Sequence, residues 1–225
     1  MEENVHRWIE GLNEVLSDHK NEERSRAMAA YMQEKFRFYG IPGELRKQVL
    51  RTYASSAPVL TDDQKREVIV NLWRQAEARE LHYCAQELAV RWKCYTRAAD
   101  IELIKTMIIE HSWWDTVDLI ASNLLGGYMK LFPEQYAVIQ AWNADENMWL
   151  VRSTLLYQLK YKDATDLQRL EALIIPHTSN TEFFIKKAIG WALRQASKHH
   201  KELVRQLVER LPLQPLSSKE ASKYL

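Results

Sequence analysis

The chain has 225 residues, 46% of them hydrophobic, which is enough for a continuous core without support from a disulfide or a metal. Its 31 Lys and Arg balance 30 Asp and Glu, and the formal net charge of +1 excludes the overall basic excess of many nucleic-acid-binding domains. Cys84 and Cys94 lack metal-ligand spacing, and no stretch approaches the ~20 apolar residues of a membrane span. We therefore expect a cytoplasmic protein that uses neither a metal nor a cofactor.

Apolar residues recur with a helical period of about 3.6 from end to end, and alternation over the length of a strand is hard to find. Helices are expected at residues 4–18, 22–38, 43–55, 61–75, 78–92, 98–110, 114–131, 133–143, 147–161, 164–174, 182–198 and 201–211. Start signals support several of these, such as the N-cap cluster at Thr61 and Pro133 at a helix start. Since no flexible linker interrupts the pattern, we expect one all-α domain over residues 1–225.

Short helices joined by short turns are typical of either a globin-like bundle or a helical repeat, and internal periodicity distinguishes the two. Three apolar columns repeat at a spacing of 34 residues: Val117, Val151 and Ile185; Ala121, Leu155 and Ile189; Leu125, Leu159 and Leu193. A step of 33 residues back from the first member of each column reaches Cys84, Leu88 and Trp92. These columns predict a HEAT-like helical repeat solenoid, an α-α superhelix whose concave face suits a long, stiff ligand.

The residue after each member of the first column is charged: Asp118, Arg152 and Lys186. Because they occupy equivalent positions of successive helices, we expect them to form one row, about 10 Å apart. A row of this kind is ordinarily a solvated face, and that interpretation stays open here. Residues 183–201 strengthen the functional alternative, because they contain no acid and five cations: Lys186, Lys187, Arg194, Lys198 and Lys201.

Large aromatic residues flank the charged row. Trp113, Trp149 and Phe183 are expected in the core, as most large aromatics are. Trp114 lies four residues before Asp118, so the two side chains share one face of their helix. Trp191 follows Lys186 by five residues and can approach the same region from the next repeat.

Several segments resemble the AlkD family of DNA alkylation repair glycosylases. The strongest are SWWDTVD (112–118), NMWLVR (147–152), EFFIKKAIGWALR (182–194) and PLSSKEA (215–221). Weaker matches are MAAYM (28–32) and FYGI (38–41), so the resemblance extends over nearly the whole chain. One departure is Pro42-Gly43-Glu44, where the family commonly has polar residues and a proline after the Gly-Ile turn.

This resemblance implies a DNA N-glycosylase that holds duplex DNA on the concave face and excises positively charged N3- or N7-alkylated purines. Asp118 matches the catalytic carboxylate, Trp114 and Trp191 match the tryptophans that contact the lesion, and Arg152 matches an arginine that contacts phosphate. Other positions similar to DNA-facing residues are Tyr31, Lys160, Lys187 and Arg194, and Lys186 belongs to the basic stretch expected to bind phosphates. The implied partner is double-stranded DNA carrying alkylated bases, bound by a monomer away from membranes.

Two other classes of protein fit the same helical pattern. A non-catalytic HEAT-like scaffold would keep the fold and the cations, but a carboxylate such as Asp118 facing phosphates would cost it affinity. A protein-binding solenoid would be favoured if the face around Asp118 were neutral and apolar. The presence of Asp118 together with Trp114 and Trp191 favours the enzyme.

Overall fold

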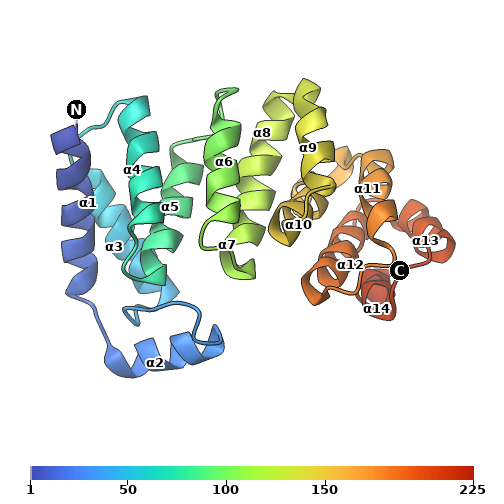
Figure 1. The fold of residues 1–225 in the computed structure, drawn as a ribbon, viewed down its shortest axis with the longest axis horizontal. Coiled ribbons are helices and arrows are strands. Elements are labelled where there is room, and N and C mark those ends of the chain that lie inside the picture. Colours follow the sequence, from blue (N-terminus) through green and yellow to red (C-terminus); the bar gives the residue numbers. More distant parts are fainter. Residues whose placement is uncertain (1) are drawn as a thin grey trace. The chain divides into compact units, whose positions relative to one another are not determined.

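Residues 2–225, which the computed structural model describes, form helices joined by turns, with no strand in that range (Figure 1). The prediction of an all-α helical repeat class is confirmed. The chain divides into two units, Met1–Cys94 and Tyr95–Leu225. That the chain forms one domain therefore stays a prediction. No helix within the described range is long and apolar enough to cross a membrane.

The first unit packs its helices around a core rich in large apolar side chains. Its helices are α1 (Glu2–Ser17), α2 (Glu22–Tyr31), α3 (Gly43–Ser56), α4 (Asp62–Arg74) and α5 (Arg79–Arg91). Trp8, Leu12 and Trp73 are fully buried there, and the ring of Trp8 lies 5.1 Å from that of Tyr53 on α3. The predicted N-cap at Thr61 is confirmed: its side chain and that of Gln64 form a reciprocal capping box.

The helix expected over residues 22–38 is shorter in the structure and ends at Tyr31. Gln33 and Glu34 both adopt a φ of 57°, in the left-handed region, and no α-helix continues through two such residues. The buried Glu80 carboxylate then accepts hydrogen bonds from the backbone N–H groups of residues 39, 40 and 41 at 3.0, 2.8 and 3.1 Å. These three hydrogen bonds hold residues 39–41 in a non-helical conformation.

Gly40 is required by the same loop, because its φ is +85° and a Cβ there would lie 2.1 Å from the backbone oxygen of Asn21. We expect Gly40→Ala to lower the free energy of unfolding by more than about 1 kcal/mol, through backbone strain and displacement of Asn21. Urea unfolding measures this directly. Gly43→Ala is the matched control, since a Cβ at Gly43 meets nothing within 4 Å. Equal unfolding midpoints for the two variants would contradict the prediction.

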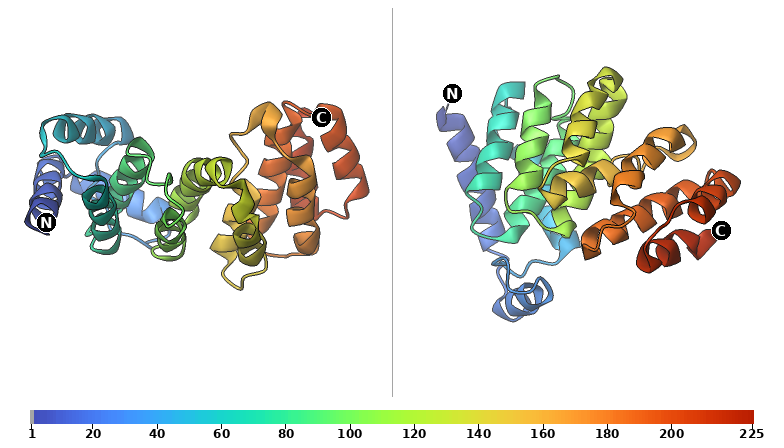
Figure 2. Two further views of the ribbon diagram at one scale, coloured as in Figure 1. Left: turned by 90° about the horizontal axis from the view of Figure 1, so that it is seen from above. Right: turned by 45° about the vertical axis from the view of Figure 1, so that its right-hand side comes forward.

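The second unit continues the helical pattern and contains a helix that the sequence pattern missed. Its α-helices are α6 (Asp100–Ile109), α7 (Trp114–Leu119), α8 (Gly126–Leu131), α9 (Tyr136–Asn143), α10 (Met148–Leu156), α11 (Leu167–Ile174), α12 (Phe183–Ser197), α13 (Lys201–Arg210) and α14 (Pro215–Ala221). A π-helical segment, Ile120–Leu125, joins α7 to α8. The helix expected at 147–161 ends at Leu156. The unpredicted α14 begins at Pro215 and packs against α12 (Figure 2).

The three apolar columns lie where the repeat predicts them. Val117, Val151 and Ile185 are buried on α7, α10 and α12, and α10 packs against both of the other helices. The remaining members are buried as well, except Leu159, which is partly exposed. The 34-residue spacing therefore corresponds to one helix of the stack in each repeat.

One expected core residue lies at the surface. Phe183 is 54% exposed, whereas its neighbour Phe184 packs against the rings of Trp113 and Trp149 at 5.2 and 5.0 Å. The reason is helical phase: Phe184 lies four residues before the buried Ala188, so both face inward. The prediction was wrong for Phe183 and is confirmed for Trp113 and Trp149.

Candidate functional site

The start of α7 presents an indole and a carboxylate on one face. Trp113 adopts an extended backbone at the N-cap position and is buried, and the helix begins at Trp114. Trp114 and Asp118 are four residues apart on this helix, so their side chains lie on the same side of it. Both are partly exposed, with 19% of the Asp118 side chain accessible.

The helix widens directly after Asp118. Within the π-helical segment, Ser122 Oγ donates to the backbone oxygen of Asp118 at 2.8 Å, and Asn123 Nδ2 donates to that of Leu119 at 2.8 Å. Such widened turns recur at functional sites because they change the direction in which neighbouring side chains project. The widening is followed by Gly126, whose missing Cβ would lie 2.4 Å from the oxygen of Tyr157. The segment after α10 therefore packs close to this helix.

A buried arginine holds the Asp118 carboxylate in place. Arg152 Nε and Nη2 donate to Asp118 Oδ1 and Oδ2 at 2.7 and 2.8 Å, and Nη1 donates to the backbone oxygen of Phe184. Arg152 is only 2% exposed. Its three donating nitrogens thus connect α10 to α7 and α12, and the two parallel bonds define the plane and position of the carboxylate.

The electrostatic state of Asp118 reflects two opposed effects. Burial raises the pKa of its carboxyl above the usual value, while the hydrogen bonds and charge of Arg152 lower it and Asp115 raises it further. Both carboxylate oxygens accept hydrogen bonds from Arg152, a geometry that favours the ionised form. The site therefore holds a partly desolvated negative charge in a fixed orientation.

The indole of Trp191 on α12 is surrounded by cations. The guanidinium of Arg152 lies 5.7 Å from the ring centroid, that of Arg194 lies 5.8 Å away, and Lys187 Nζ lies 6.0 Å away. Arg152 contacts both this indole and Asp118, so it joins the carboxylate and the aromatic surface into one site. Trp191 itself is partly exposed, which leaves part of the ring accessible.

Glu220 on α14 is a site residue that the sequence interpretation missed. Glu220 is 5% exposed, and its carboxylate accepts hydrogen bonds from Lys187 Nζ at 2.9 Å, Arg194 Nη1 at 2.5 Å and Lys223 Nζ at 2.9 Å. Hydrogen bonds from Lys187 and Lys223 lower the pKa of Glu220 to about 2. The signal in the sequence was the run of five cations without an acid over residues 183–201, because a cation that is partly buried there is stabilised by a carboxylate from elsewhere in the fold.

A pocket of about 360 Å³ opens beside Trp191. Three cations line it: Lys160, Arg194 and Lys198. Lys160 Nζ donates to Asn123 Oδ1 at 2.6 Å, and Lys198 Nζ lies 5.5 Å from the ring centroid of Tyr224. Positive charge beside an accessible aromatic face suits a nucleic-acid backbone with its bases.

The structure joins most of the predicted site residues within the second unit. Direct contacts connect Asp118, Arg152, Trp191, Lys187 and Arg194. Lys160 lines the adjoining pocket, and Trp114 lies on the same helix face as Asp118.

The two remaining predicted site residues lie on α12 and α2. Lys186 is partly exposed on α12, and its backbone oxygen accepts a hydrogen bond from Ser217 Oγ at 3.0 Å. Tyr31 ends α2 in the first unit and is 73% exposed.

Arg152 has a different environment from the one that its predicted role requires. The resemblance implies a phosphate contact, but the guanidinium is buried and directed at Asp118 and Phe184. The geometry favours a role in holding the carboxylate, and the phosphate contact stays a prediction.

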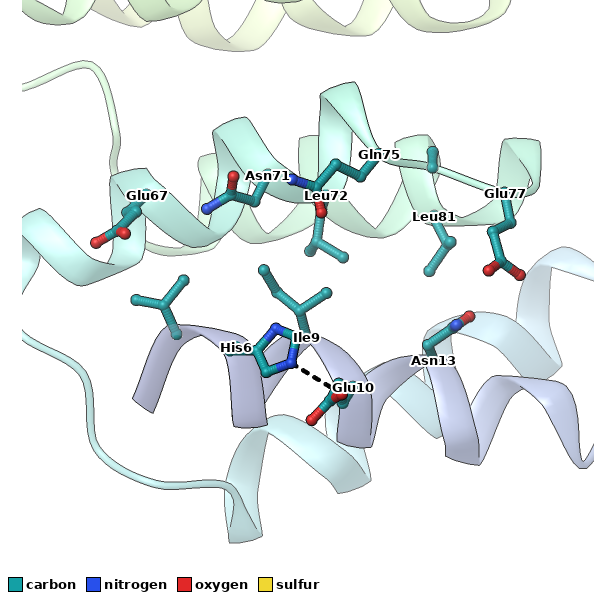
Figure 3. Close-up of a pocket in the computed structure, with 12 residues that line it drawn as sticks. His6, Ile9, Glu10, Asn13, Glu67, Asn71, Leu72, Gln75, Glu77 and Leu81 are labelled. Carbon is teal, nitrogen blue, oxygen red and sulfur yellow. Dashed lines mark ion pairs between the residues drawn. The ribbon is translucent and has the colours of Figure 1, made fainter. Parts of the chain in front are cut away.

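The first unit contains a pocket of different character, about 420 Å³ in volume, between α1 and α4 (Figure 3). Its lining includes Glu10, Glu67 and Glu77 but no Lys or Arg. His6 Nε2 lies 2.9 Å from Glu10 Oε1, the ion pair drawn in Figure 3. A pocket with this charge repels phosphate, so it is a poor candidate for a nucleic-acid site. Among residues 2–225, no three acid, His or Cys side chains are grouped so that they could hold a metal ion.

Comparison with known proteins points to DNA repair. Residues 12–225 match the family model described as DNA alkylation repair enzyme. A solved structure described as a predicted DNA alkylation repair enzyme from Enterococcus faecalis is 34% identical, with a TM-score of 0.79 over 92% of this chain and 97% of that one. The structure of smu.31 from Streptococcus mutans UA159 is 14% identical, with a TM-score of 0.60 over 91% of this chain and 98% of that one, which shows a similar fold alone. No curated protein sequence matches the chain.

Proposed function

Because the chain belongs to the DNA alkylation repair enzyme family, we propose that it is a DNA N-glycosylase that excises positively charged N3- or N7-alkylated purines from duplex DNA. The observation that carries this proposal is the Asp118 carboxylate, held by the buried Arg152 beside the indole of Trp191. A fixed negative charge next to an aromatic face is suited to a cationic transition state.

The leaving group needs little help in this reaction. An N3- or N7-alkylated purine already carries a positive charge, so the electron pair of the breaking C1′–N bond neutralises the base as it departs. The difficulty lies in the sugar, which becomes an oxocarbenium-like cation as in glycoside hydrolysis. Water then forms the new bond to C1′ and loses a proton, leaving an abasic site and a free base.

Asp118 is proposed to act on that sugar cation. Its negative charge stabilises the positive charge that develops at C1′, and a carboxylate oxygen can orient the attacking water. Burial strengthens this effect, because the Asp118 side chain is only 19% exposed and the field of its carboxylate is less screened by water. Arg152 keeps the group ionised and in position.

Trp114 and Trp191 are proposed to contact the lesion. An indole face attracts a cation by about 1–2 kcal/mol when water is excluded, so it favours the charged base and sugar over neutral DNA. The surrounding cations, Lys160, Lys186, Lys187 and Arg194, together with Tyr31 on the first unit, are proposed to contact the DNA backbone. We propose that the protein acts as a monomer in the cytoplasm and without a cofactor.

The test is release of free base from a duplex that contains one N7-methylguanine. We expect the wild-type protein to release N7-methylguanine and leave an abasic site, measured by chromatography of the free base and by alkaline cleavage of the strand. Undamaged duplex is the control for non-specific cleavage. Binding without release would instead support the non-catalytic scaffold, and a repaired guanine left in the strand would exclude a glycosylase.

A further inference from the structure

The C-terminal helix α14 brings one buried carboxylate to the Trp191 site. Glu220 accepts hydrogen bonds from Lys187, Arg194 and Lys223, all at 2.9 Å or less. Two of these cations, Lys187 and Arg194, lie 6.0 and 5.8 Å from the Trp191 ring centroid. A single carboxylate is thus the shared anchor of two cations at the edge of this indole.

The packing of α14 on α12 makes this arrangement possible. Gly190 lies on α12 directly before Trp191, and a Cβ there would meet Glu220 Cβ at 2.5 Å and the backbone oxygen of Ser217 at 2.9 Å. Ser217 Oγ also donates to the backbone oxygen of Lys186 at 3.0 Å. Because the two helices are in close contact at this point, the Glu220 carboxylate reaches the cations next to Trp191.

Without Glu220 the site would carry an excess of positive charge. Arg152 is compensated by Asp118, but within the described range Glu220 is the carboxylate with which Lys187 and Arg194 form ion pairs. A cationic base or sugar that approaches Trp191 would be repelled by two uncompensated cations at its edge. The same cations would also repel each other and move away from their present positions.

We propose that Glu220 is a positioning residue of the lesion site: it holds Lys187 and Arg194 beside Trp191 and offsets one of their two positive charges, so that a cationic base or sugar can lie against the indole. This inference rests on the proposed glycosylase function. Since the pKa of Glu220 is lowered to about 2, the carboxylate is ionised at every pH used to assay such a protein.

The test compares two inert sugar analogues in one duplex sequence: a protonated pyrrolidine that mimics the sugar cation, and the neutral tetrahydrofuran of the same shape. The measured quantity is the ratio of their dissociation constants. We expect wild type to prefer the cation, and Glu220→Gln to reduce that preference about tenfold, the effect of one charge across about 12 Å at an effective dielectric near 20. Affinity for undamaged duplex should stay equal or rise, with a steeper salt dependence.

Glu209→Gln is the matched control, because Glu209 is exposed on α13 in the same unit and its substitution changes the net charge equally. We expect it to leave the preference for the cation unchanged. Glu220→Asp keeps the charge and should recover most of the preference. The double variant Glu220→Gln with Lys223→Gln restores the net charge, yet should still show the loss because Lys187 and Arg194 lack their carboxylate. If Glu220→Gln alone does not fold, the same measurement is made on this double variant.

An unchanged preference in folded Glu220→Gln, or in the double variant if the single one does not fold, would overturn the proposal. Equal weakening of all three duplexes would overturn it too, because that result indicates a structural role only. Failure of the proposed function is visible separately, as absence of base release by wild type. The ratio of the two dissociation constants does not depend on turnover. A failure of the Glu220 proposal can therefore be distinguished from a failure of the proposed glycosylase function.

Discussion

Replacing Asp118 with Asn is expected to slow the release of N7-methylguanine from duplex DNA by about 100- to 1000-fold, the loss typical of removing one preorganised electrostatic group from an active site. Asn has nearly the same shape but no charge, so it cannot stabilise the sugar cation or accept both hydrogen bonds from Arg152. The measurement is the single-turnover rate with enzyme in excess, which separates the chemical step from binding and product release.

Asp115→Asn is the matched control for this variant. Asp115 lies on the same helix, three residues before Asp118, and its substitution removes the same charge. We expect it to keep base release within a few-fold of wild type, because the charge of Asp115 repels Asp118 and raises the pKa of Asp118, so that its removal leaves Asp118 ionised. Equal loss in the two variants, or full activity in Asp118→Asn, would remove Asp118 from its proposed role.

Arg152→Ala is expected to have the largest effect on stability. It leaves the Asp118 carboxylate without its partner and the backbone oxygen of Phe184 without a donor, in a part of the core where Arg152 is 2% exposed. Removing one partner of a buried ion pair typically costs about 3–5 kcal/mol of unfolding free energy. Urea unfolding of Arg152→Ala, Asp118→Asn and the double variant measures this, and the double variant should be less destabilised than the sum of the two.

The same substitution tests how Arg152 acts on the proposed reaction. The pKa of Asp118 is already raised by burial, and loss of the hydrogen bonds from Arg152 would raise it further. Because the ionised carboxylate is the active form, activity falls as pH drops through this pKa, so the acid limb of the pH–rate profile should move to higher pH. Arg152→Lys, which keeps the charge but loses the paired hydrogen bonds, should show a smaller move if Arg152→Ala is too unstable to assay.

Salt dependence distinguishes this role from a phosphate contact. If Arg152 only holds Asp118, the slope of duplex affinity against salt should match wild type in the folded variant. A slope reduced by about one unit would instead support the phosphate contact implied by the sequence resemblance. An acid limb at the wild-type pH, together with the reduced slope, would contradict the positioning role.

Much of the fold could be predicted because helical periodicity is a local property. Apolar residues at i, i+4 and i+8 identified a stripe that is buried except at Leu159 and that begins on α7, α10 and α12, and their 34-residue spacing identified neighbouring repeats. The boundaries that failed depended on distant residues. The chain leaves the helix after Tyr31 through Gln33 and Glu34, and Glu80, far along the sequence, then binds the backbone of residues 39–41.

In the candidate site, too, the sequence predicted the features that depend on local helix geometry and missed those that depend on contacts between distant residues. The row of Asp118 and Arg152 was predictable, since equivalent positions of adjacent repeats lie side by side. Their direct pairing was not, because spacing along the sequence identifies a face and not the partner of each side chain. Phe183 and Phe184 illustrate the limit. A shift of one residue along the helix decides which of the two rings faces the core, and at the first turn of α12 too few helical residues precede them to show which face is buried.

Composition and periodicity alone predicted that this chain is helical, that its helices repeat, and that an acid, two indoles and several cations lie at positions of successive repeats. Only the tertiary structure shows that Arg152 is buried and paired with Asp118, and that Glu220 on α14 forms ion pairs with Lys187 and Arg194. The physical reason is that a helix face is set by local geometry, whereas ion pairs between helices depend on how closely their backbones approach. Here Gly190 permits that approach for α12 and α14.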